Sequence, residues 1–156
     1  MPTSVSRFQG TNIVSFLQSQ LRQTMGRGEC WDAADTAIRS LAARRPNASQ
    51  LYVWGKVVLP AALQPGDVLQ FSNFVSTVTV NSETSIDTTE IQLGTPRHTA
   101  IVSAVNIDGS VNLLHQNFRD DRFVTTLSNV FLKVVTQSPT AVAIRGSVTC
   151  YRPQIP

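Results

Sequence analysis

Three side chains of this sequence could together supply a sulfur nucleophile and its base. Cys30 lies in the stretch GRGECWD, where two glycines precede a helical pattern. A thiol in the first turn of a helix lies beside free backbone N–H groups and the positive end of the helix dipole, and both favour the thiolate. The histidines of the chain are His98 and His115. We expect His98 to deprotonate Cys30 and to return the proton to a leaving amine, while His115 or Asn117 orients the His98 ring.

The two histidines fall on a predicted β-hairpin. Residues 98–117 are rich in apolar and β-branched side chains on both sides of a turn sequence at 106–109. In an antiparallel hairpin, the numbers of two residues that face each other across the strands add up to a constant sum. Because side chains alternate along a strand, His98 and His115 share a face if this sum is odd. An even sum would bring Gln116 to the face of His98 instead. The pairing register therefore decides whether the histidines meet.

Each of these residues also has a simpler interpretation. Cys30 shares its helical stripe with Ala34 and Leu41, and buried helical cysteines are common. Each histidine taken alone could be an ordinary strand residue. A cysteine at a helix start, a histidine at a strand start and a polar side chain on the next strand together favour catalysis. We assign Trp31 and Asn117 to substrate binding, although aromatic side chains more often belong to the core.

Other kinds of chemistry have less support in the sequence. No close-spaced pair such as C-x-x-C or H-E-x-x-H could start a metal site, and no glycine-rich phosphate loop follows a strand, so we expect neither metal nor cofactor. The formal net charge of +3 is too small and too scattered to indicate nucleic-acid binding. No apolar stretch approaches the roughly 20 residues of a membrane span, and no signal peptide is evident. We expect a cytoplasmic protein, or one exported without a recognisable signal peptide.

The elements that position these groups begin with two predicted helices. The chain of 156 residues is 42% hydrophobic and 15% charged, which allows a sizeable core. Apolar residues at helical spacing predict a first helix that is capped by Thr11 or Asn12 and ends before Gly26. A second helix is predicted to begin at Cys30 and to end before Pro46.

Beyond Leu51 the pattern changes to short β-branched runs separated by turn residues, which predicts an antiparallel sheet. A Ser/Thr-rich insertion is predicted at about 72–95, and Cys150 is predicted to be a buried strand thiol. The fold class is α+β: N-terminal helices packed on a central antiparallel sheet or half-open barrel, in one domain spanning residues 1–156. Besides the two strands of the hairpin, the predicted strands are 68–71, 130–135, 141–144 and 147–151.

The order of the motifs resembles that of a known superfamily. GRGECWDAA, LQPGDVLQF, HTAIVSAV and GSVNLLHQN follow one another as in papain-like cysteine hydrolases of the CHAP type and their NlpC-type relatives. The resemblance covers about residues 26–117. It implies a papain-like fold with Cys30 as nucleophile, His98 as base, and His115 or Asn117 as the third polar group.

The function that follows is a cysteine amidase or peptidase that works through a thioester intermediate. The resemblance implies a peptide or peptidoglycan-like substrate, and the backbone N–H of Cys30 is a candidate donor to the oxyanion. Two alternatives stay open: a catalytically inactive binding or structural domain on the same fold, and acyl transfer like that of a transglutaminase or deamidase. The sequence leaves the oligomeric state open.

Overall fold

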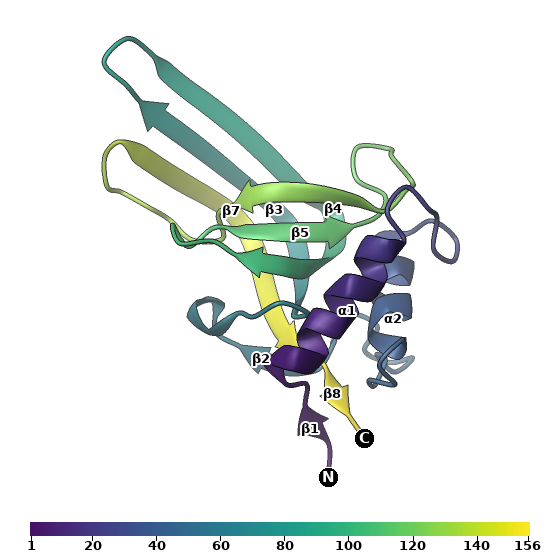
Figure 1. The fold of residues 1–156 in the computed structure, drawn as a ribbon. Helices are drawn as coiled ribbons and strands as arrows, with labels where there is room; N and C mark the ends of the chain where they lie inside the picture. Colours follow the sequence, from purple (N-terminus) through teal and green to yellow (C-terminus); the bar gives the residue numbers. More distant parts are fainter.

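A bent antiparallel sheet with two helices on one side forms the fold (Figure 1). This computed structural model describes all residues from 1 to 156. No helix has the length and apolar composition that crossing a membrane would need. The elements, with a short 3-10 helix at Pro60–Ala62, are β1 (Thr3–Ser4), α1 (Arg7–Ser19), α2 (Cys30–Arg39), β2 (Lys56–Val58), β3 (Val68–Asn81), β4 (Ile86–Val105), β5 (Val111–His115), β6 (Thr125–Val130), β7 (Thr140–Arg152) and β8 (Gln154–Ile155).

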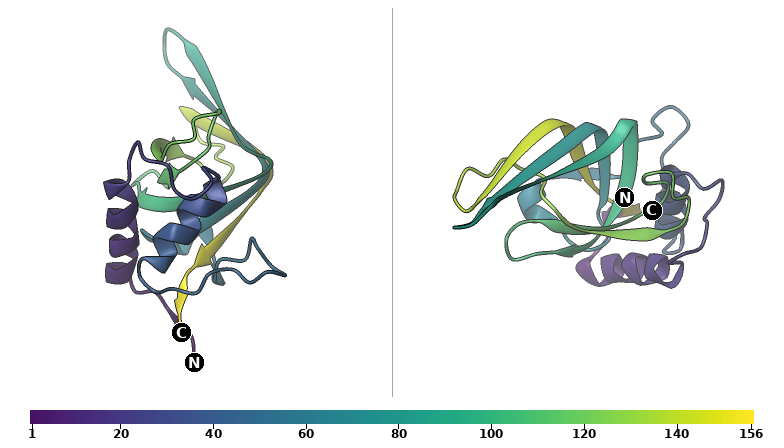
Figure 2. Two further views of the ribbon diagram at one scale, coloured as in Figure 1. Left: turned by 90° about the vertical axis from the view of Figure 1, so that its right-hand side faces the viewer. Right: turned by 90° about the horizontal axis from the view of Figure 1, so that it is seen from above.

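The main sheet has six strands in the order β2-β7-β3-β4-β5-β6, and every neighbouring pair is antiparallel. A bridge between Val135 and Val142 joins the segment that follows β6 back to β7. The sheet therefore curls over one of its faces, as the view from above shows (Figure 2). Strands β1 and β8 form a separate two-stranded sheet that brings the chain ends together (Figure 1). The predicted antiparallel sheet with N-terminal helices is confirmed.

Two hydrophobic clusters lie on opposite faces of the sheet. Alternation along β4 separates them, because Ile101 belongs to one cluster while Ala100 and Val102 belong to the other. The first cluster holds the buried side chains of both helices and lies between them and the sheet. The second lies inside the curl and includes Phe71 and Phe74. We call these the helix face and the inner face of the sheet.

The two helices differ in how well the sequence predicted them. Helix α2 begins at Cys30, as predicted. Helix α1 begins earlier than predicted, because the Ser6 hydroxyl accepts the Gln9 N–H at 3.1 Å and the Gln9 side chain accepts the Ser6 N–H at 2.9 Å. This reciprocal capping box replaces the predicted cap at Thr11 or Asn12.

A long hairpin formed by β3 and β4 projects beyond the rest of the sheet (Figure 1). The predicted insertion at 72–95 forms its outer part, with residues 74–81 paired to residues 86–93. Strand β7 runs alongside β3 as one strand, where two had been predicted. Gly146 makes this continuity possible, because its φ is +73° and an added Cβ would lie 2.0 Å from the Asn73 carbonyl oxygen. The predicted strand at 130–135 is wrong, because β6 ends at Val130.

Candidate active site

Cys30 is the first residue of α2 and is partly exposed. Its sulfur lies near the N–H of Trp31 and near both the N–H and the hydroxyl of Thr99 in β4. Burial raises the pKa of the Cys30 thiol, although these hydrogen-bond donors lower it in part. The N–H of Trp31 at the helix start thus favours the thiolate, as expected, but loss of water outweighs it and the net shift of the pKa is upward.

The glycine-rich loop before Cys30 is held by Asp32. The Asp32 carboxylate accepts the Arg27 N–H at 3.0 Å and the Glu29 N–H at 3.3 Å. Gly26 has a φ of +56°, and an added Cβ there would lie 2.8 Å from the Asp32 Cβ. Glycine at this position therefore lets the loop close over the carboxylate that fixes the start of α2.

A second support for this loop comes from Gln116, just after β5. Its Oε1 accepts the Met25 N–H at 2.7 Å, and its Nε2 donates to the carbonyls of Met25 at 3.0 Å and Glu29 at 2.8 Å. Gln116 is fully buried. The next residue, Asn117, donates to the Glu29 carboxylate at 3.0 Å. The end of β5 therefore fixes the backbone that leads to the thiol.

The two histidines meet on the inner face. Nε2 of His98 lies 2.9 Å from Nδ1 of His115, and the rings are edge-on to each other. The ring of Phe118 stacks on His115 at 4.8 Å between centroids. Ile101 faces Leu114, which is the odd-sum register that the shared face requires. The prediction that the two histidines share a face is confirmed.

Burial keeps both imidazoles neutral. It lowers the pKa of His98 to about 4. It also lowers the pKa of His115 to about 3, with repulsion from the His98 ring as the next cause. Nε2 of His115 is buried and has no hydrogen-bond partner.

Cys30 and His98 are not joined by a hydrogen bond, which corrects the predicted contact. His98 faces Phe71 across the β3–β4 pair, on the inner face. The neighbouring Thr99 has its side chain on the helix face, where its hydroxyl donates to Gln70 Oε1 at 2.7 Å. Because successive side chains alternate, Thr99 rather than His98 lies against the sulfur.

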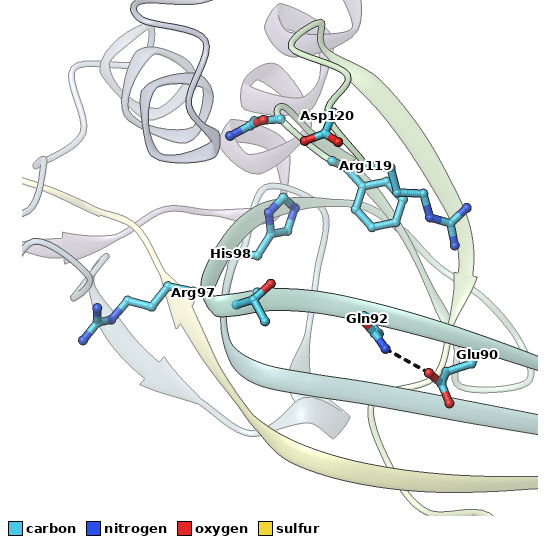
Figure 3. Close-up of a pocket in the computed structure, with 10 residues that line it drawn as sticks. Glu90, Gln92, Arg97, His98, Arg119 and Asp120 are labelled. Carbon is cyan, nitrogen blue, oxygen red and sulfur yellow. Dashed lines mark hydrogen bonds between the residues drawn. The ribbon is translucent and has the colours of Figure 1, made fainter.

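The thiol and the imidazole line different hollows. The thiol hollow has a volume of about 570 Å³, and the imidazole hollow about 580 Å³. Trp31 lines the first and Asn117 the second, so the two side chains assigned to substrate binding lie apart. Arg97 lines both hollows and points away from Arg119 on the far side of the imidazole hollow (Figure 3).

The family described as the AIM3/BBC1 cysteine proteinase-fold domain matches residues 3–153. The chain belongs to this family. Neither the comparison with curated proteins nor that with solved structures gives a match. The family match supports a cysteine-proteinase fold without singling out the CHAP or NlpC type.

Within this AIM3/BBC1 domain, several residues near the site were not predicted to have a role. Thr99 contacts the sulfur, Gln70 holds Thr99, and Gln116 supports the loop before Cys30. The signal that could have found Gln116 is the run His115–Asn117. Consecutive strand residues point to opposite faces, so one of three adjacent polar side chains had to face the helices.

No group of three or more His, Cys, Asp or Glu side chains lies close enough together anywhere in the AIM3/BBC1 domain to hold a metal ion. Both cysteines are free, and Cys150 is buried in β7 as predicted. Burial raises the pKa of Cys150 to about 11. Cys30 is therefore the thiol that a reagent or substrate can reach.

Proposed function

We propose that this domain is a cysteine hydrolase in which Cys30 attacks an amide carbonyl and His98 handles the proton. The observation that carries the proposal is that Cys30 and Thr99, the residue directly after His98, line the same hollow. The thiol and the imidazole therefore lie beside the same part of β4, on its two faces, and the His98 ring is oriented by its 2.9 Å contact with His115. The family match, which gives a cysteine-proteinase fold, supports the same chemistry.

The proposed reaction has two steps. The Cys30 sulfur bonds to the carbonyl carbon while its proton passes to His98, and collapse of the tetrahedral intermediate forms a thioester. The amine leaves with that proton. Water then attacks the thioester, gives a proton to His98, and releases the acid while the proton returns to Cys30. The Cys30 N–H, which is free at the start of α2, can donate to the oxyanion in both steps.

Proton placement on the imidazole pair decides whether His98 can act as a base. With His98 Nε2 connected to His115, the nitrogen left for the thiol is Nδ1. Nδ1 of His98 accepts a proton only if its Nε2–H donates to His115 Nδ1, which puts the single ring proton of the neutral His115 on Nε2. The proposal therefore assigns this tautomer. Because the thiol and the imidazole lie on opposite faces of β4, it also requires the β4 backbone at His98 and Thr99 to shift when substrate binds.

The substrate class follows the sequence resemblance. CHAP-type and NlpC-type domains imply an amide in a peptide or in a peptidoglycan stem peptide, so we propose this class of bond. Purified bacterial sacculi incubated with the protein, followed by mass spectrometry of the released fragments, test the peptidoglycan branch. Release of the same fragments by a Cys30→Ser variant would contradict it.

An activated ester tests the chemistry without knowledge of the substrate. With p-nitrophenyl acetate, we expect a burst of nitrophenolate and an acetyl group on Cys30, located by peptide mass spectrometry. The His98→Gln variant should slow the burst about 100-fold, the lower end of the usual contribution of a positioned base. Cys150→Ser is the matched control and should leave the burst unchanged.

Two observations favour a second function. The missing hydrogen bond between Cys30 and His98 and the raised pKa of the thiol suit a binding domain that keeps the fold without the reaction. Equal acetylation rates in the wild-type protein and the His98→Gln variant would support that second function and contradict the hydrolase.

A further inference from the structure

Four side chains form the walls of the thiol hollow: Trp31, Leu51, Tyr52 and Pro96. They are apolar or aromatic, and the thiol lies among them. An apolar hollow with a few polar groups at fixed positions is the usual form of a small-ligand site. The charged groups at its rim therefore decide which ligand can bind there.

Two of the three charged groups around this hollow are already paired. Arg27 donates to the Asp32 carboxylate at 3.2 Å. Glu29 forms an ion pair with Arg122 at 2.9 Å and accepts a hydrogen bond from Asn117 at 3.0 Å. Neither group has a free charge to offer a ligand.

Arg97 is the third charged group, and it has no anionic partner. Its guanidinium lies over the Tyr52 ring at 4.7 Å and forms no ion pair with any Asp or Glu of the chain. The stacking orients the planar guanidinium while its N–H groups stay free, which is the form in which arginine binds a carboxylate with two hydrogen bonds.

A second stacked arginine at the same wall shows the difference. Arg45 lies over the Trp31 ring at 5.7 Å, but it also donates to both oxygens of Asp35, at 3.0 and 2.8 Å. The chain thus supplies a carboxylate to one stacked arginine and none to the other. The missing carboxylate at Arg97 is the place for a ligand group.

We propose that the hollow at Cys30 binds a ligand with a carboxylate, and that Arg97 is the residue that selects it. An acidic peptide side chain or a peptide C-terminus meets this description, and the shared chemistry is a carboxylate next to the bond at the thiol. The inference rests on the proposed function in taking the Cys30 hollow as the substrate site. Arg97 is then a specificity residue that binds substrate without reacting.

Alkylation of Cys30 tests the proposal without turnover. Iodoacetate and iodoacetamide react with the same sulfur and release the same iodide, but only iodoacetate carries a carboxylate. The quantity measured is the rate with iodoacetate divided by the rate with iodoacetamide at Cys30, normalised to the same ratio for 2-mercaptoethanol. We expect this normalised ratio to fall about fivefold in Arg97→Gln, as for loss of an exposed ion pair. Arg97→Lys should keep part of the ratio, and added salt should lower it.

Arg27→Gln is the matched control, because Arg27 lines the same hollow with its charge already paired. Its ratio should stay close to that of the wild-type protein. Equal ratios in the wild-type and Arg97→Gln proteins, or equal losses in the Arg27→Gln and Arg97→Gln proteins, would overturn the proposal.

Protection by a matched pair of ligands separates binding from general attraction of anions. Acetyl-glutamyl amide and acetyl-glutaminyl amide differ only in carboxylate against carboxamide. The first should slow the labelling of Cys30 by iodoacetamide more than the second, and Arg97→Gln should remove the difference. Equal protection in the wild-type protein overturns the proposal. A normal p-nitrophenyl acetate burst together with equal protection by the two ligands would support the hydrolase and contradict the carboxylate site. No burst together with stronger protection by acetyl-glutamyl amide would contradict the hydrolase and support the carboxylate site.

Discussion

The reactive groups on the two sides of β4 are held in place by different means. On the helix face, polar side chains fix the thiol: Gln116 and Asp32 bind the backbone of the loop before Cys30. On the inner face, His98 and His115 lie among aromatic side chains, with one hydrogen bond between the rings. The thiol therefore has a fixed backbone and an open hollow, whereas the imidazoles are buried and neutral.

The contrast shows which part must change for the two groups to meet. If the His98 ring turned, it would lose its hydrogen bond to His115, and because both rings are buried, little water could replace that bond. The Cys30 side chain is partly exposed, but rotation about its one side-chain bond keeps the sulfur on the helix face. For the thiol and the imidazole to meet, substrate binding therefore has to shift the β4 backbone at His98 and Thr99.

Removal of the Gln116 support should have the largest effect. Gln116→Ala removes three hydrogen bonds: the Met25 N–H loses its partner, and the carbonyls of Met25 and Glu29 keep only the N–H groups of Gly28 and Ala33, so the free energy of unfolding should fall by about 3 kcal/mol. Urea denaturation measures this loss, and hydrogen exchange should show faster exchange of the Met25 amide. Asn117→Ala is the neighbouring control, and loss of its one hydrogen bond should cost about 1 kcal/mol. Equal losses of unfolding free energy in the two variants would show that Gln116 stabilises the loop before Cys30 no more than Asn117 does.

Acid should lower the stability of the domain mainly through the two histidines of the inner face. The folded pKa values of His98 and His115, about 4 and about 3, lie below the ordinary value of 6.5. The unfolded chain therefore binds more protons between these values, so stability is full above about pH 6.5 and falls as the pH drops toward 4. Each histidine contributes a slope of at most about 1.4 kcal/mol per pH unit.

Urea denaturation across this pH range measures that slope. The double variant His98→Asn, His115→Asn should show a shallower slope, because the carboxylates that remain titrate mostly at lower pH. An unchanged slope would mean that the two rings do not carry the pH dependence, and that the inner face is less closed to water than its burial indicates.

The contact between Thr99 and the sulfur should give the smallest effect. The Thr99 hydroxyl donates its one proton to Gln70 while Cys30 is a thiol, and can turn that proton to the sulfur when the thiolate forms. Thr99→Val removes this donor, so the thiol pKa should rise further. Labelling of Cys30 by iodoacetamide at pH 8 should slow about twofold to threefold. Thr99→Ser keeps the hydroxyl and should react like the wild-type protein. Faster labelling of Thr99→Val would show that the hydroxyl covers the sulfur rather than stabilising its thiolate.

Local patterns predicted the parts of the site that depend on neighbours in sequence. The helix start at Cys30 follows from glycines before an amphipathic run, and Asp32 at the third helical position completes it. The hairpin around residues 106–109 follows from its turn residues. Other local patterns are incomplete, because the predicted cap at Thr11 or Asn12 lies inside α1, which is capped by Ser6, and because β3 continues beyond Phe71.

The sequence by itself determined that His98 and His115 lie on one face, given an odd register, because alternation relates side chains within a strand pair. Only the tertiary structure decided which face meets α2. That choice depends on which cluster of apolar side chains the helices cover, and the helices cover the cluster that contains Ile101. Thr99 therefore faces the thiol, and His98 faces the inside of the curled sheet.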